Sequence, residues 1–362
     1  HVIRYSSDQL GSVIKQINNT GYGLTLGIHS RIEAFAETVY RNTIAGNTYI
    51  NRNMVGAVVG VNPFGGRGLS GTGPKAGGPN YLLRFSAASK PAEAEKPLAD
   101  KKPLADRKPL ANKKPSADKE PLADKKPSAN EKPYAISLPT SSKAENQTTQ
   151  DLAAQATAAT PQWQATTMDS RLATLSQCNP TFTARLEPIA RAKLANPIEL
   201  PGPTGEDNKL SLQGRGPMVL VVRKEDAIEA AEQQIVSALL CGCPVIVAAD
   251  SAHQAALENL QANYQQAGLA KALLQLAPME SLSELIQNNG IEGLITNSLN
   301  TDSTDLRQIM TKRTGSIIPL IEWPETTEGF NYHWLLWFLS ERTRTENLVA
   351  RGGNTQLFNL AE

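Results

Sequence analysis

The chain has 362 residues, of which 40% are hydrophobic, so it is long enough to bury the cores of one or two domains. Its formal net charge of +1 argues against binding to nucleic acid mainly by bulk positive charge. Three cysteines are too few for a disulfide framework and fit a reduced, cytoplasmic setting. No apolar run approaches the ~20 residues that span a bilayer, and no signal-peptide pattern opens the chain.

Strand and helix patterns alternate in residues 1–86. The chain starts at once with a strand-like VIRY, so we expect it to be a piece of a longer protein, cut inside a domain. A capped amphipathic helix follows at residues 6–18, then a strand at 25–30, a helix at 31–42 and a strand at 47–52. Such βαβ units predict a parallel, buried sheet.

A low-complexity linker is expected at residues 87–165. A six-residue unit of the type KPLADK repeats there and places a proline at positions 97, 103, 109, 115, 121, 127 and 133. Prolines at this spacing block long helices, and the apolar content is too low to offset the cost of ordering the chain. Acidic residues interrupt every basic cluster, which favours a disordered Pro/Lys/Ala spacer over a basic docking arm.

Residues 166–362 again alternate between strand and helix, which predicts a doubly wound α/β sheet. The expected strands are residues 216–223, 244–249, 273–277, 293–298 and 316–322, with helices at 225–240 and 251–268. The aromatic stretch 331–341 has the helical spacing of core or domain contact, and residues 345–360 alternate like a hairpin around Gly352-Gly353.

Between the last N-terminal strand and the linker, residues 51–82 hold nine of the chain's 26 glycines. Glycine permits positive φ and a close approach of the backbone, so this loop could wrap a small ligand and present amide donors to a carboxylate. Composition alone favours the simpler interpretation, in which the glycines only make tight turns over a core. No Gly-Lys-Ser/Thr phosphate-binding motif is present.

The segments GYGLTLGIHSRI, AGNTYINRN and GAVVGVNPFGGRGLSGTGPKAGGPNYL resemble the last ~85 residues of an aldehyde dehydrogenase catalytic domain. The residues of these segments are similar to those of the glutamate semialdehyde dehydrogenase module in the bifunctional proline utilization A family. This resemblance implies that Gly56 and Ala57 anchor the substrate carboxylate through backbone amides and that Phe64 lines the aldehyde pocket.

The resemblance also implies that the nucleophilic cysteine, the general-base glutamate and the NAD-binding residues lie upstream of His1. We therefore expect no catalytic, cofactor-binding or metal-binding residue here, and this fragment alone would be inactive. Cys178, Cys241 and Cys243 do not resemble the family's nucleophile segment. The C-x-C pair could bind metal or oxidise, but its apolar neighbours favour buried structural cysteines.

The C-terminal segments LPGPTGEDNKL, ALLCGCPVIVAADSAHQAA, GLITNS and TGSIIPLIE resemble a second, truncated cofactor-binding half of the same superfamily. The family's Lys-Pro pair aligns with Ala248 and Ala249, and Asp250 adds a negative charge where phosphates would approach. The general-base segment is replaced around Glu322, Trp323 and Pro324. We expect a Rossmann-like but noncatalytic domain that covers the substrate tunnel, takes part in assembly and has a closing flap that pairs with another element.

The resemblance implies a C-terminal part of an NAD-dependent enzyme that oxidises glutamate semialdehyde to glutamate in proline catabolism. It further implies a homo-oligomer and no nucleic-acid binding by this fragment. If an upstream proline dehydrogenase domain is present, that domain would bind FAD. The whole enzyme could also associate peripherally with a membrane. One alternative is a noncatalytic scaffold of the same fold. Another is independent NAD binding by residues 200–325.

Overall fold

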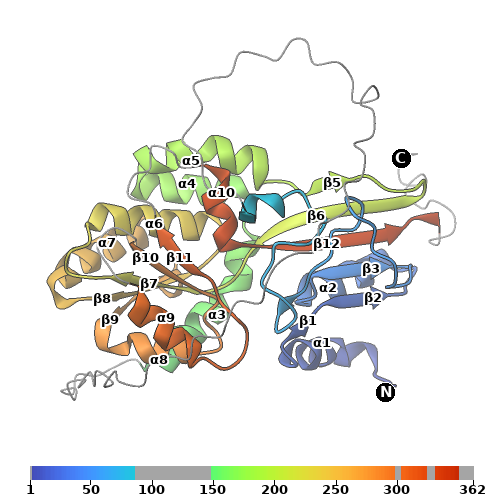
Figure 1. Cartoon of the computed structure of the whole chain (residues 1–362), viewed down its shortest axis with the longest axis horizontal. Coiled ribbons are helices and arrows are strands. Elements are labelled where there is room, and N and C mark those ends of the chain that lie inside the picture. The colour runs from blue at the N-terminus through green and yellow to red at the C-terminus, as the bar shows by residue number, and fades with distance from the viewer. Residues whose placement is uncertain (1, 86–147, 298–302, 324–330, 350–362) are drawn as a thin grey trace, which may run out of the picture. The chain divides into compact units, whose positions relative to one another are not determined.

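The computed structural model describes residues 2–85, 148–297, 303–323 and 331–349 (Figure 1). The helices within these ranges are α1 Leu10–Asn19, α2 Glu33–Asn42, α3 Thr149–Ala165, α4 Met168–Cys178, α5 Pro180–Lys193, α6 Ile228–Leu240, α7 Gln254–Gln266, α8 Leu282–Gln287, α9 Thr304–Thr311 and α10 Tyr332–Leu335. The strands are β1 Tyr22–Gly23, β2 Thr25–Ile28, β3 Asn47–Ile50, β4 Arg67–Gly68, β5 Ile198–Leu200, β6 Glu206–Gly214, β7 Met218–Val222, β8 Val245–Ala249, β9 Leu274–Pro278, β10 Gly293–Asn297, β11 Leu320–Trp323 and β12 Leu339–Asn347.

One sheet is parallel throughout its described strands, in the order β11-β10-β7-β8-β9. The chain enters at the centre on β7, moves outward through β8 and β9, and returns to the other side of β7 for β10 and β11. Helices cover both faces (Figure 1), which is why the strands are apolar on both sides. The mixed α/β class expected from the sequence is confirmed.

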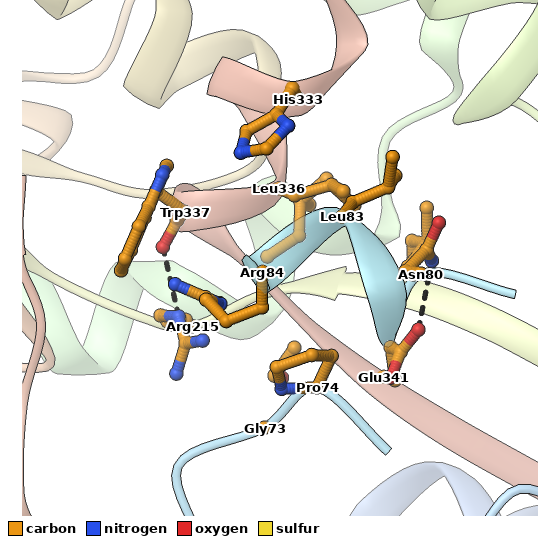
Figure 2. Close-up of a pocket in the computed structure, with 13 residues that line it drawn as sticks. Gly73, Pro74, Asn80, Leu83, Arg84, Arg215, His333, Leu336, Trp337 and Glu341 are labelled. Atoms are coloured by element: carbon orange, nitrogen blue, oxygen red, sulfur yellow. Dashed lines mark hydrogen bonds between the residues drawn. The ribbon is translucent and has the colours of Figure 1, made fainter. Parts of the chain in front are cut away.

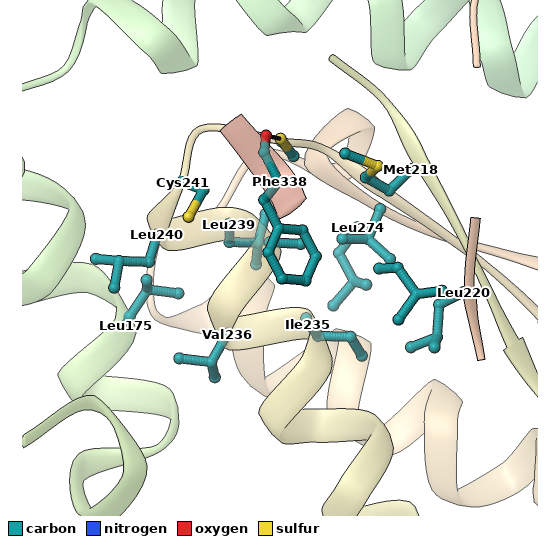
Figure 3. Packing of buried hydrophobic residues seen from close by; sticks show 14 of the residues in the cluster. Leu175, Met218, Leu220, Ile235, Val236, Leu239, Leu240, Cys241, Leu274 and Phe338 are labelled. Carbon is teal, nitrogen blue, oxygen red and sulfur yellow. Dashed lines mark hydrogen bonds between the residues drawn. The ribbon is translucent and has the colours of Figure 1, made fainter. Parts of the chain in front are cut away.

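The side chains of the central strand alternate between two cores. Met218, Leu220 and Val222 join the core beneath α4, α5, α6 and α7, whereas Val219 and Val221 join the core beneath α3, α8 and α9. Figure 3 shows the first core, in which Phe338 lies among the leucines of α6 and the sheet. A side chain of this size stabilises the fold by roughly 1.5–3 kcal/mol when fully buried.

A second sheet joins the two ends of the chain. Its order is β2-β3-β12-β6-β5, so strands from the first 50 residues pair with strands that lie beyond residue 197. β12 runs parallel to β3, with Thr343 opposite Asn47, and antiparallel to β6, with Thr343 opposite Leu210. The described parts of residues 1–88 and 145–362 accordingly form one compact unit.

The N-terminal segment has a small core of its own. The βαβ unit β2-α2-β3 is parallel, as expected, and Ile14 of α1 packs with Ala36 and Val39 of α2 against the sheet. Residues 2–5, in contrast, form no strand: no described strand pairs with them, and Val2 is 93% exposed. The strand expected at VIRY is therefore wrong: its backbone pairs with no described strand and remains exposed to water, so its apolar residues gain nothing from an extended pairing.

The structure differs from the sequence-based linker at its C-terminal end. Residues 149–165 form α3, which begins with a capping box between Thr148 and Asp151. Leu152 and Ala156 are buried beneath this helix, and the Trp163 indole Nε1 donates to the Leu239 carbonyl at 2.9 Å. The proline-repeat part of the linker, residues 87–147, lies outside the described residues, as does the Gly352-Gly353 hairpin.

Aromatic residues of the 331–341 stretch occupy a short helix and a turn, as their spacing indicates. α10 is followed by a 3-10 turn at Leu336–Phe338 and then by β12. Phe338 is fully buried and packs edge-to-face against Trp323 at 6.4 Å between ring centroids. Among the described residues, no helix combines the length and the apolar content that crossing a bilayer requires.

Candidate functional site

The glycine-rich loop leaves β3 at Ile50 and remains on the surface through its first ten residues. Gly56 has φ +86°, a conformation that L side chains rarely adopt, and both Gly56 and Ala57 are exposed. Among the described residues, no hydrogen bond engages the backbone N–H of either residue. Two adjacent amide donors are thus available to a ligand at this turn.

Phe64 marks the point where the loop folds back on itself. Its backbone forms an antiparallel bridge with Ala76, with N–H to O distances of 3.0 and 2.9 Å between the two residues. The Phe64 side chain remains 36% exposed. The structure therefore places all three sequence-predicted residues at the surface of one loop, with Phe64 on a more firmly held part of it.

One face of β12 holds this loop in place. Glu341, Thr343 and Thr345 alternate along the strand, so their side chains point to the same side of the sheet. Thr343 Oγ1 donates to Asn47 Oδ1 at 3.0 Å, and Thr345 Oγ1 accepts from Asn62 Nδ2 at 3.0 Å. The three residues are buried, and such a network is stabilising only because each member finds a partner.

Glu341 and Lys75 form the centre of the network. The Glu341 carboxylate accepts from the Lys75 backbone N–H at 2.5 Å and from Asn80 Nδ2 at 2.8 Å. The Lys75 ammonium donates to Asn47 Oδ1 at 2.8 Å and also to the Gly65 carbonyl. Burial lowers the pKa of Lys75 to about 7. The negative charge of Glu341 acts to raise this pKa, whereas the positive charges of Arg67 and Arg342 lower it further.

Beside this network lies a small pocket where two arginines and a histidine meet (Figure 2). The Arg84 guanidinium stacks over the Trp337 ring at 3.6 Å from its centroid, and Arg215 Nε donates to the Trp337 carbonyl at 2.9 Å. His333 also lines the pocket, and burial, followed by the charge of Arg84, lowers its pKa. The pocket has a free volume of about 20 Å³, room for little more than a water molecule.

The cysteines have the environment of structural residues. Cys241 and Cys243 are buried, and desolvation raises the pKa of the Cys241 thiol and raises that of Cys243 to about 11. Cys178 is half-buried, with its pKa also raised to about 11 by desolvation. The expectation of buried C-x-C cysteines is confirmed. No cluster of His, Cys, Asp and Glu suited to a metal occurs in the described part of the chain.

The carboxyl ends of β8 and β9 border a cavity of about 430 Å³. Its lining includes the carboxylates of Asp250, Glu258 and Glu280. Asp250 is fixed there, because its Oδ2 accepts from the Lys224 backbone N–H at 2.8 Å. The three carboxylates give this cavity a negative lining.

Sequence reasoning missed the residues that support the loop, namely Lys75, Asn80, Glu341 and Thr343. The alternation of Glu341, Thr343 and Thr345 is a signal that could have been noticed, but polar alternation normally indicates a solvated strand face. Their partners lie more than 250 residues away in sequence, so only the fold brings them together.

Comparisons with known proteins concern mainly the N-terminal quarter of the chain. The aldehyde dehydrogenase family model matches residues 1–90. The bifunctional protein PutA of Salmonella typhimurium is 62% identical over 91 residues, which are 25% of this chain and 7% of that protein. A 1-pyrroline-5-carboxylate dehydrogenase of Bacillus subtilis is 46% identical over 77 residues, or 21% of this chain and 15% of that protein.

Among solved structures, a mutant PutA from Bradyrhizobium japonicum superimposes with a TM-score of 0.44 and 21% identity, covering 48% of this chain and 21% of that one. The chain thus spans only a small part of the curated relatives it matches. Residues 1–90 carry an aldehyde dehydrogenase-family sequence, and they are similar to the corresponding part of the bifunctional PutA proteins.

Proposed function

We propose that this chain is the C-terminal part of an NAD-dependent glutamate semialdehyde dehydrogenase that acts in proline catabolism. Residues 1–86 supply the end of the catalytic domain, including the substrate anchor. The nucleophilic cysteine, the general base and the NAD site belong to the preceding part of the enzyme. The names of the relatives support this proposal, since they include 1-pyrroline-5-carboxylate dehydrogenases as well as PutA.

The observation that carries the proposal is the pair of amide donors at Gly56 and Ala57, which are exposed and without partners in the described part of the chain. An amide donor gains strength when its acceptor is charged, so a substrate carboxylate is a suitable occupant. Phe64, one-third exposed on the same loop, supplies an apolar surface for the carbon chain of the aldehyde. The glycines allow the main chain itself to bind the substrate carboxylate.

Residues 166–362 form a doubly wound, Rossmann-like domain that has no catalytic role. The three carboxylates around the ends of β8 and β9 support this role, because together they would repel phosphate groups placed in that cavity. We further propose that this domain helps to cover the substrate tunnel and that residues 87–147 act as the spacer. The whole enzyme would be a cytoplasmic homo-oligomer, with FAD bound in any proline dehydrogenase domain that it contains.

The test is steady-state kinetics on the longer enzyme that contains this chain, with glutamate semialdehyde and NAD. Ala57→Pro removes one of the two amide donors, and we expect it to raise KM about tenfold or more, the value of one hydrogen bond to a charged group. Val59→Pro is the matched control, because Val59 is 84% exposed on the same loop. It should leave KM within about twofold.

Equal KM values for the two variants would contradict the anchor role. A longer protein that reduces no NAD with this substrate would instead favour a noncatalytic scaffold of the same fold. Calorimetry of NAD binding to the 362-residue chain tests the remaining alternative: micromolar affinity would contradict a C-terminal domain that does not bind the cofactor.

A further inference from the structure

The second half of the glycine-rich loop borders a cavity of about 130 Å³, which we call the Arg67–Arg215 cavity. Loop residues 66–73 form one wall, Arg215 extends into it from the end of β6, and Glu292 lies just before β10. Ser340 and Glu341 of β12 close the remaining side. Segments from both ends of the chain therefore build it, and it lies apart from the exposed turn at Gly56.

The two guanidinium groups of this cavity have only neutral partners. Arg67 Nη1 donates to Gln213 Oε1 at 3.0 Å, while Arg215 donates to the carbonyls of Trp337 at 2.9 Å and Thr72 at 3.1 Å. Within the described residues, neither forms an ion pair with a carboxylate. Desolvation lowers the pKa of each arginine to about 10. Both remain charged at neutral pH, and nearby carboxylates, Glu292 above all, act on them through space without a direct ion pair.

Two acids, Glu292 and Glu341, also line the cavity and balance the two arginines in formal charge. The Glu341 carboxylate accepts from the Lys75 backbone N–H and from Asn80. Burial raises the pKa of Glu292, while nearby arginines lower it. Further cations surround the site: Lys75 in the lining, Arg342 near Arg67, and Arg84 near Arg215 in the adjoining pocket (Figure 2), and these make the surroundings positive.

We propose that the Arg67–Arg215 cavity binds a small oxyanion of phosphate size. Each guanidinium has five N–H donors, and the bonds described above use one on Arg67 and two on Arg215, so donors remain for the oxygens of an anion. Arginine forks match phosphate and carboxylate geometry bidentately.

A space of about 130 Å³ admits an anion of phosphate size. Ile44, Arg67, Arg215 and Glu292 also border a neighbouring cavity of about 710 Å³, so the body of a phosphate ester has room beside the anion. The site is thus one for a free anion or for the terminal phosphate of an ester, and it stands independently of the proposed dehydrogenase function.

The experiment is calorimetric titration of the 362-residue chain with sodium phosphate at constant ionic strength, with sodium chloride as the blank. We expect saturable one-to-one binding. Arg67→Gln should weaken it about 10- to 100-fold, the range for loss of one or two charged hydrogen bonds. Arg191→Gln, which removes the same charge from an exposed position on α5, is the matched control and should leave the affinity unchanged.

Glu292→Gln provides a test that loss of folding cannot imitate. Removing a negative charge from the lining should tighten phosphate binding severalfold. Circular dichroism checks that each variant is folded. The proposal is overturned if phosphate gives no more heat than chloride up to 20 mM, if Arg67→Gln binds like the unsubstituted chain, or if Glu292→Gln weakens binding. Sulfate should compete with phosphate, and acetate should compete less well.

Discussion

Lys75 should make the stability of this fold depend on pH in the alkaline range. Its side chain is buried at 1% exposure, and its pKa falls from an ordinary 10.5 to about 7. Between these two pH values the unfolded chain holds a proton that the folded chain has released. The unfolded state then binds more protons, so the free energy of unfolding rises with pH. The whole difference corresponds to about 5 kcal/mol.

Lys75→Met isolates this effect. Methionine keeps the apolar stem, and the acceptors that lose the ammonium retain other donors: Asn47 Oδ1 still accepts from Thr343, and the Gly65 carbonyl still accepts from Asn47 Nδ2. We expect the unsubstituted chain to gain about 2.5 kcal/mol more than the variant between pH 7.5 and pH 9.5, because each pH unit in this window contributes about 1.4 kcal/mol.

The assay is urea-induced unfolding at both pH values, followed by circular dichroism. All other titrating groups are common to both proteins and cancel in the comparison. Lys193→Met, at an exposed lysine on α5, serves as the control and should show no such difference. If the stability difference between the unsubstituted chain and Lys75→Met is the same at pH 7.5 and pH 9.5, the ammonium is not desolvated as described.

Three further predictions concern packing. Gly46→Ala should lower the free energy of unfolding by at least about 2 kcal/mol, because the added Cβ would lie 2.4 Å from the Gly65 carbonyl oxygen. Gly11→Ala in α1 is the control: its Cβ meets no atom within 4 Å, so the variant should be neutral or stabilising when both are compared by urea unfolding. Trp163→Phe should cost about 1–2 kcal/mol by loss of one buried hydrogen bond, and no loss would mean that α3 is not docked. Cys241 and Cys243 should react with iodoacetamide at pH 7.5 only on unfolding, as mass spectrometry would detect; rapid labelling of the native chain would refute their burial.

The sequence by itself determined the parts of the fold that depend on local pattern. The apolar runs of β7 and β8 and the helical spacing of α6 predicted a parallel sheet covered on both faces, because burial on both sides requires continuous apolar strands. The glycine-rich loop was likewise visible in the sequence, since positive φ at a position such as Gly56 is available to few other residues.

Only the tertiary structure decided which distant segments meet. The Ala/Thr-rich composition of residues 149–165 suggested a linker, yet Leu152 and Trp163 find buried contacts and the segment becomes α3. Glu341 and Thr343 would be ordinary polar residues on a solvated strand, but β12 pairs with β3 and places Glu341 against Lys75 and Thr343 against Asn47. Hydrogen bonds between residues some 260–300 positions apart leave no local pattern, because their energy depends on a register that the folded chain alone establishes.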